Sequence, residues 1–233
     1  TDINGTEFAR SVSAYRILVD QAIVDHPKAL AELAAPILDV DQDWLKEQLI
    51  GERRYVVISQ GVKPRVWREL EAAVDSYNDE IAKKENGLAK RLMGFFAERI
   101  YVREYPEGEL GAAVIGFINR AGSGAAGLEY SMNSTLSGID GHYTYANAAG
   151  TIIPGTQKIT TEAVRGNTVK LTIDRDVQWV AQEAIRTVVK SSRALSGTVV
   201  VMDPATGQVL AHATYPSFTP GDTKDVDPYR WQN

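Results

Sequence analysis

Cysteine is absent from this chain, and its absence excludes several kinds of chemistry at once. Without thiols, the protein can form no disulfide, no thiolate metal site and no cysteine nucleophile. The three histidines, His26, His142 and His212, are too far apart in sequence to show a zinc-ligand spacing. We therefore expect neither a metal centre nor a bound cofactor.

Long apolar runs and an excess of positive charge are also missing. No run approaches the roughly 18 apolar residues that a membrane-spanning helix needs. The formal net charge is −5, which is unfavourable for binding a phosphate backbone. We therefore expect no nucleic acid partner and no transmembrane segment within these 233 residues.

Two weak enzyme signals are present, and the sequence argues against both. Residues 122–127, GSGAAG, match the G-x-G-x-x-G pattern of dinucleotide-binding sites. The acid that follows, Asp140, precedes the next strand-like segment at 142–145, and no βαβ repetition follows, so we reject nucleotide binding. Carboxylate pairs such as Glu129 and Asp140 suit a glycosidase, but 30 acidic residues produce such pairs by chance. No G-x-S-x-G pattern supports a serine hydrolase, so an unrelated hydrolase is the weakest alternative.

The spacing of apolar residues predicts the elements of the first hundred residues. In chain order they are a turn at Asn4-Gly5 and a strand within 1–24, two short helices within 27–51, a short strand within 53–62 and an amphipathic helix after Pro64. Asp41 is placed to cap the second helix, and Gly87 is expected to break the amphipathic helix.

The last ninety residues combine β-branched segments with one helical pattern. Short strands joined by turns are expected between 144 and 166, and a strand through Val169, Leu171 and Ile173. Asp174 then caps a helix, and Asp203 to Gly207 forms the turn of a hairpin, because Pro204 presets φ and Gly207 tolerates a positive φ. The apolar stripe predicted for the helix comprises Val177, Val180, Ala181, Ala184, Ile185 and Val188.

A glycine-rich stretch at 101–141 carries a recognisable order of motifs. They read Arg103-x-Tyr105-Pro106-x-Gly108, a small-residue run ending at Gly116, Gly127-x-Glu129 and Leu136-x-Gly138-x-x-Gly141. This order resembles the non-catalytic module of class B penicillin-binding proteins, the peptidoglycan transpeptidases, and of their division-type branch. Asp2, Asn4 and Gly5 match the end of the family's first signature, R-G-x-I-x-D-R-N-G, in which Ile3 here replaces an Arg.

The resemblance implies an α+β fold with two domains. Residues 1–165 would form a mixed pedestal, or dimerisation, module of short strands and helices. Residues 166–233 would form the first strand, helix and hairpin of a β-lactamase-like transpeptidase domain. Without the resemblance, the segment Asp2-Ile-Asn-Gly5 is simply a polar turn.

Arg103 and Glu129 stand at motif positions that the family fills with an arginine and a glutamate. The resemblance implies that they belong to a charged network that joins the module to its neighbour, and the alternative is two unrelated surface charges. Many family members have histidine where Ala113 stands here, so the surroundings of this network differ in detail.

The catalytic motifs of the family are missing from this chain. No serine is followed three residues later by lysine, and no K-T-G or K-S-G occurs. The S-x-N match at Ser131-Met-Asn133 lies inside the non-catalytic motifs and is accidental. We therefore expect no catalytic residue here, although the parent protein is expected to be a serine-type D,D-transpeptidase. Tyr215 to Pro220 and Trp231 to Asn233 resemble the approach to its nucleophile.

The resemblance also implies a cellular setting. The parent would lie on the extracytoplasmic face of the plasma membrane, anchored by an upstream helix that this chain lacks. Its expected partners are a polytopic membrane glycosyltransferase and other elongation or division proteins, with the peptidoglycan precursor bound only by the full-length parent. The alternative is a free-standing protein-interaction module derived from such an enzyme.

Overall fold

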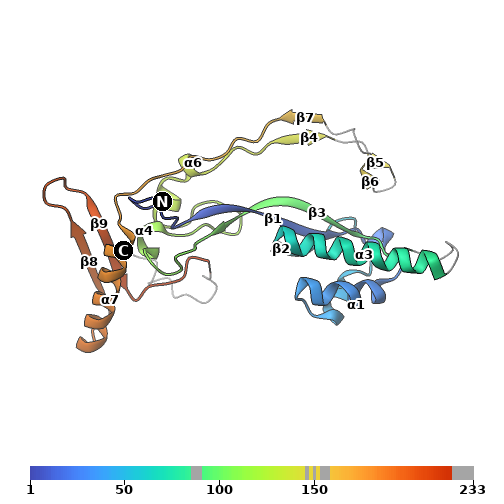
Figure 1. Cartoon of the computed structure of the whole chain (residues 1–233), viewed down its shortest axis with the longest axis horizontal. Coiled ribbons are helices and arrows are strands. Elements are labelled where there is room, and N and C mark those ends of the chain that lie inside the picture. Colours follow the sequence, from blue (N-terminus) through green and yellow to red (C-terminus); the bar gives the residue numbers. More distant parts are fainter. Residues whose placement is uncertain (85–90, 145–146, 149–150, 153–157, 222–233) are drawn as a thin grey trace. The chain divides into compact units, whose positions relative to one another are not determined.

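The computed structural model describes residues 1–84, 91–144, 147–148, 151–152 and 158–221 (Figure 1). The chain divides into two compact units, one formed by Ser11–Val102 and the other by Thr1–Arg10 together with Arg103–Asn233. These units follow the contacts of the chain. The predicted domain boundary at 165/166 rests on the family resemblance and stays a prediction.

The Ser11–Val102 unit combines a three-stranded sheet with helices. Its elements are β1 (Arg10–Val19), the 3-10 helix η1 (Gln21–Ile23), α1 (Pro27–Leu38), α2 (Gln42–Gln48), β2 (Val56–Val62), α3 (Pro64–Lys84) and β3 (Phe95–Glu104). The strand order is β2-β1-β3, and β1 runs antiparallel to β2 with Val19 opposite Val56. These elements confirm the predicted order of strand, two helices, strand and helix, whereas β3 was not predicted. Gly87, the expected helix breaker, lies outside the described residues.

Apolar side chains from the sheet and all three helices form the core of this unit. Ile17 and Val19 come from β1, Leu45 from α2 and Leu70 from α3, and each is at most 1% exposed. α1 packs against α2 and α3 and contributes buried leucines and alanines (Figure 1). The Asp41 carboxylate accepts a hydrogen bond from Trp44 N at 2.8 Å, which confirms the predicted cap.

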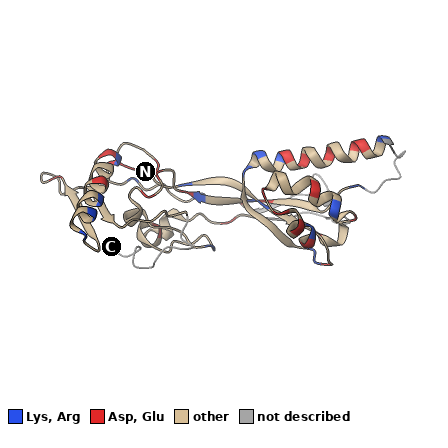
Figure 2. Cartoon of the chain, turned by 90° about the horizontal axis from the view of Figure 1, so that it is seen from below, with Lys and Arg blue, Asp and Glu red and all other residues tan. Residues whose placement is uncertain are grey.

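Charged residues recur along helix α3, as its amphipathic pattern predicts (Figure 2). Glu71, Asp75, Asp79 and Lys83 are exposed, while Leu70 and Asn78 are buried. Among the helices that the structure describes, none is both long and apolar enough to cross a bilayer.

Short elements follow β3 in the second unit. They are α4 (Ala112–Ile115), α5 (Gly127–Ser131), α6 (Asn133–Leu136), β4 (His142–Thr144), β5 (Asn147–Ala148), β6 (Thr151–Ile152) and β7 (Lys158–Thr161). β4 pairs antiparallel with β7, and β5 with β6 (Figure 1). The predicted run of short strands is therefore confirmed.

The second unit ends in a helix and a hairpin, namely α7 (Arg175–Ser192), β8 (Gly197–Met202) and β9 (Val209–Tyr215). β8 and β9 are antiparallel with Val200 opposite His212. Gly207 has φ of +74° and its N–H donates to the carbonyl of Asp203 at 2.8 Å, so the predicted turn is confirmed. The predicted cap is also confirmed, because the Asp174 carboxylate accepts from two N–H groups of the first turn of α7.

Two predictions for this end of the chain were wrong. Val169 to Ile173 forms no regular strand. Instead its main chain bonds to residues 1–3, with Leu171 N donating to Thr1 O and Ile3 N to Ile173 O, both at 2.9 Å.

The apolar stripe predicted for α7 was also partly wrong. Val180 and Val188 are 59% and 57% exposed, whereas Gln178 and Gln182 are buried beside Ala181. The helix is rotated from the predicted stripe because both amides hydrogen-bond to main-chain groups of neighbouring segments. Gln178 accepts from His212 N at 2.8 Å and donates to His212 O at 3.0 Å.

Candidate functional site

Arg103 and Glu129, the two predicted network residues, form an ion pair. Arg103 lies at the end of β3 and Glu129 in α5, and Arg103 Nε lies 2.7 Å from Glu129 Oε1. The side chains are only 17% and 5% exposed. The interpretation of two unrelated surface charges is thereby excluded, because a carboxylate this deeply buried requires such a partner.

Tyr105 lies beside this ion pair. Its hydroxyl oxygen accepts a hydrogen bond from Ile118 N at 3.1 Å. Burial raises the pKa of Tyr105 to about 12, and the negative charge of Glu129 adds to this shift. The phenol therefore stays neutral at physiological pH and fixes the backbone that leads away from α4.

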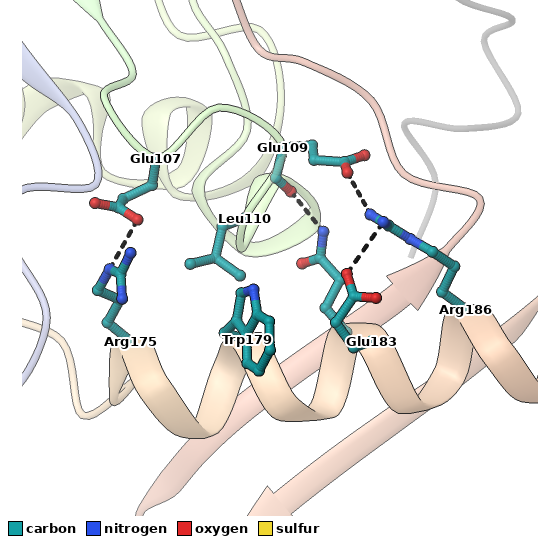
Figure 3. A pocket seen from close by; sticks show the side chains of 8 residues that line it. Glu107, Glu109, Leu110, Arg175, Trp179, Glu183 and Arg186 are labelled. Atoms are coloured by element: carbon teal, nitrogen blue, oxygen red, sulfur yellow. Dashed lines mark hydrogen bonds and ion pairs between the residues drawn. The ribbon is translucent and has the colours of Figure 1, made fainter.

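The Y-P-x-G part of the motif forms a tight turn after Tyr105. Gly108 N donates to Tyr105 O at 3.0 Å, Gly108 has φ of +59°, and Pro106 is exposed at the turn's second position. The turn places Glu107 and Glu109, which flank Gly108, so that both side chains reach helix α7 (Figure 3).

Residues 107–111 and helix α7 are joined by a set of polar contacts that we call the junction (Figure 3). Glu107 Oε2 lies 2.8 Å from Arg175 Nε, and the carboxylate of Glu109 pairs with the guanidinium of Arg186. The buried amide of Gln182 donates to Glu109 O at 3.1 Å and accepts from Gly111 N at 3.2 Å. These contacts hold α7 along three turns.

The Asp2-Ile-Asn-Gly5 segment bonds to the N-terminal end of the same helix. Asp2 is 1% exposed, and its carboxylate accepts from Asn4 N and Thr6 N and, at 3.2 Å, from Arg175 N. Asn4 Nδ2 donates to the capping carboxylate of Asp174 at 3.1 Å. Gly5 has φ of +97°. The segment is thus more than the simple polar turn of the alternative interpretation.

The motif glycines allow backbone segments to lie unusually close together. A Cβ added at Gly116, where φ is +75°, would lie 1.9 Å from Ala126 O, and one added at Gly127 would lie 2.6 Å from Gly116 N. The end of α4 and the start of α5, the helix that contains Glu129, therefore touch through their main chains. Gly138 and Gly141 make similar close approaches to the main chain of residues 161–166.

Comparison with known proteins assigns this arrangement to a family. Residues 1–171 match the family described as the Penicillin-binding Protein dimerisation domain. The chain belongs to this family.

Relatives of known type are longer than this chain. Penicillin-binding protein PbpB of Mycobacterium tuberculosis is 42% identical over 125 residues, which are 53% of this chain and 18% of that protein. The probable peptidoglycan D,D-transpeptidase PenA of Neisseria meningitidis is 29% identical over 238 residues, which are all of this chain and 38% of that protein. The chain therefore spans less than half the length of these relatives.

Solved structures support the fold. A peptidoglycan synthetase of Bifidobacterium adolescentis matches 95% of this chain with a TM-score of 0.58 and 29% identity, over 42% of that chain. Penicillin Binding Protein 2X of Streptococcus thermophilus matches the whole chain with a TM-score of 0.68 and 22% identity, over 36% of that chain. The resemblance to penicillin-binding proteins and the α+β fold predicted from the sequence are confirmed.

The junction borders a pocket of about 250 Å³ beside the exposed ring of Trp179 (Figure 3). Its lining charges are already paired with one another, since Arg186 also lies 3.0 Å from Glu183. Among the described residues no cluster of His, Cys, Asp and Glu could hold a metal ion. The geometry is thus suited to holding a helix in place.

Several residues that hold α7 in place were not singled out from the sequence of this chain. Glu107 is an unspecified position of the motif Arg103-x-Tyr105-Pro106-x-Gly108, and Glu109 follows that motif. Gln178 and Gln182 are not among the positions of the predicted apolar stripe. Their spacing was the available signal, because two glutamines four residues apart lie on one face of a helix. The missed residues also include Arg175 and Arg186.

Proposed function

We propose that this chain is the non-catalytic part of a peptidoglycan D,D-transpeptidase and that it positions the catalytic domain. PenA of Neisseria meningitidis, which aligns with the whole chain, is described as a probable peptidoglycan D,D-transpeptidase. The sequence contains neither S-x-x-K nor K-[ST]-G, the motifs that supply the nucleophile and the substrate-binding strand in such enzymes. In this proposal the chain has no catalytic residue of its own.

One observation carries the positioning role. Both the first signature, through Asp2, and the central motif, through Glu107 and Glu109, bond to the same helix, α7. Arg175 and Arg186 are 11 residues apart, so the contacts extend over about 16 Å of helix. Contacts spread over that length resist both sliding and rotation of α7. The hairpin β8–β9 packs on this helix and is held with it.

The cellular setting is part of the same proposal. The full-length protein would act on the extracytoplasmic face of the plasma membrane, anchored by an upstream helix, in the division branch of the family. Its partners would be a polytopic membrane glycosyltransferase and other division or elongation proteins. The full-length protein, and not this chain by itself, would bind the peptidoglycan precursor. The support is the family of residues 1–171 and the similarity to a probable peptidoglycan D,D-transpeptidase.

Labelling with a fluorescent penicillin tests the proposal. The 233-residue chain and the full-length protein would each be incubated with the reagent, denatured and weighed by mass spectrometry. We expect no adduct on the chain, because it lacks a serine activated by lysine, and one adduct per molecule on the full-length protein. A stoichiometric adduct on the chain would overturn its non-catalytic role. A full-length protein that forms no adduct would favour a free-standing interaction module.

A further inference from the structure

Phe218 follows strand β9 by three residues and is buried against the motif region. Its side chain is in a cluster with Ala112 and Phe117, and it is 5% exposed. The rings of Phe117 and Phe218 meet edge to face, with centroids 5.9 Å apart and planes at 82°. Tyr105 and Ala126 pack against the same cluster. The segment leaving the hairpin is thus anchored to α4 and to residues that directly follow β3 and precede α5, the elements that carry the Arg103–Glu129 pair.

The neighbouring residue supplies a second anchor. Ser217 Oγ donates to Glu109 O at 3.2 Å, and this carbonyl also accepts from Gln182 Nε2 at 3.1 Å. One main-chain oxygen of the junction therefore ties helix α7 and the segment after β9 together. Two adjacent residues, one held by a hydrogen bond and one by ring packing, fix both the position and the direction of this segment.

We propose that Phe218 is a positioning residue through which the motif region sets the path of the chain toward the transpeptidase nucleophile. The proposal rests on the proposed function, since it requires the full-length protein to carry an acylatable serine further along the chain. Errors of about 1 Å in the placement of a reacting group lower rates by as much as about 100-fold. An anchor of this kind affects the rate without touching the substrate.

The test is acylation of the purified full-length protein by fluorescent penicillin. Three quantities are measured separately: the acylation rate constant at saturating penicillin, the affinity of the noncovalent complex that precedes acylation, and the final number of adducts per protein molecule. For Phe218→Ala we expect the rate constant to fall about 10-fold, with unchanged affinity and stoichiometry. A purely structural role would reduce the stoichiometry, because unfolded molecules do not react. Phe218→Leu keeps most of the apolar volume but loses the ring contact, so its rate constant should fall measurably but less than that of Phe218→Ala. If Phe218→Ala fails to fold, this smaller fall at full stoichiometry is the expected result, and a wild-type rate constant in Phe218→Leu overturns the proposal.

Two controls sharpen the result. Leu45→Ala removes a buried side chain from the Ser11–Val102 core and should leave the rate constant unchanged. The double variant Phe117→Leu, Phe218→Leu should have a rate constant no lower than that of the slower single variant, because both substitutions remove the same ring contact. A wild-type rate constant in Phe218→Ala, or fully multiplicative effects of the two leucine variants, would overturn the positioning role alone. An unaltered full-length protein that does not acylate would overturn the proposed function together with it.

Discussion

The core of the Ser11–Val102 unit and the motif region at 103–141 are stabilised in different ways. The core buries leucine, isoleucine, valine and alanine side chains from three helices and a sheet in one cluster. The motif region contributes to small apolar clusters, such as the one in which its Ala112 and Phe117 pack with Phe218. It depends instead on a buried ion pair, on side-chain bonds to main-chain groups and on glycines in backbone contact.

The difference concerns which substitutions each region can accept. Apolar burial is non-directional, so a core accepts side chains of similar volume. A hydrogen bond to a buried group requires a particular atom at a particular place, and its loss leaves the other partner unsatisfied. The motif region is therefore expected to be sensitive to the identity of single residues, and the core to their size.

Gly116→Ala should have the largest effect on stability. The new methyl group would overlap Ala126 O, at 1.9 Å, in a backbone that is already at a positive φ. We expect the free energy of unfolding to fall by more than about 4 kcal/mol, measured by urea denaturation of the 233-residue chain. Gly108→Ala is the matched control, because φ is +59° there but no atom lies within 4 Å, and it should cost about 1–2 kcal/mol. Equal costs at the two glycines would contradict the close-contact explanation.

Leu45→Ala should have the next largest effect, through the core of the Ser11–Val102 unit. Leu45 is fully buried, and its truncation leaves a cavity that costs about 2–5 kcal/mol, whereas Leu45→Met should cost less than about 1.5 kcal/mol. Hydrogen exchange should show the loss of protection within residues 11–102. If methionine were as harmful as alanine, the view of this core as tolerant of shape would be wrong.

The core was largely predictable from the sequence. The spacing of apolar residues predicted the three helices that contribute Leu30, Leu45 and Leu70 to the core. The caps at Asp41 and Asp174 were predicted because a carboxylate directly before an apolar repeat commonly caps a helix. β3 was missed for a physical reason. It carries charged residues that weaken the alternation of a strand, and one of them, Glu98, is held by Tyr55 Oη at 2.9 Å and Arg16 at 3.3 Å.

The candidate site was predictable only in part. The motif resemblance identified Arg103 and Glu129, and the structure brings them together. The periodicity of apolar residues could not show that Gln178 and Gln182 are buried, because glutamine counts as a polar residue in such a pattern. Their burial is possible because the side-chain amides hydrogen-bond to main-chain groups. The role of Asp2 depends on a residue 173 positions away, and no local pattern reports such a contact.

Arg103→Ala should remove about 3 kcal/mol, because it leaves the buried Glu129 carboxylate without the guanidinium that faces it. The double variant Arg103→Ala, Glu129→Ala should be less damaging than the sum of the two single changes, and thermal unfolding of all four proteins gives the coupling. Arg10→Ala is a matched surface control, since Arg10 and Glu104 are 47% and 39% exposed, and should have little or no effect. Additive single changes would argue against a coupled pair.

Asp2→Ala should have the smallest effect, and that effect should depend on pH. Burial raises the pKa of Asp2, but backbone hydrogen bonds from Thr6, Arg175 and Asn4 outweigh it, so the pKa lies below its ordinary value. The carboxylate therefore contributes stability above about pH 4, and this contribution is lost as pH falls through the lowered pKa. We expect Asp2→Ala to cost about 1–2 kcal/mol at pH 7 in urea denaturation, and less at the lowest pH at which the protein stays folded. Asp2→Asn keeps one acceptor oxygen but cannot ionise, so its cost should also shrink toward low pH. A cost that stays constant with pH in both variants would show that the charge of Asp2 contributes nothing to the anchoring of α7.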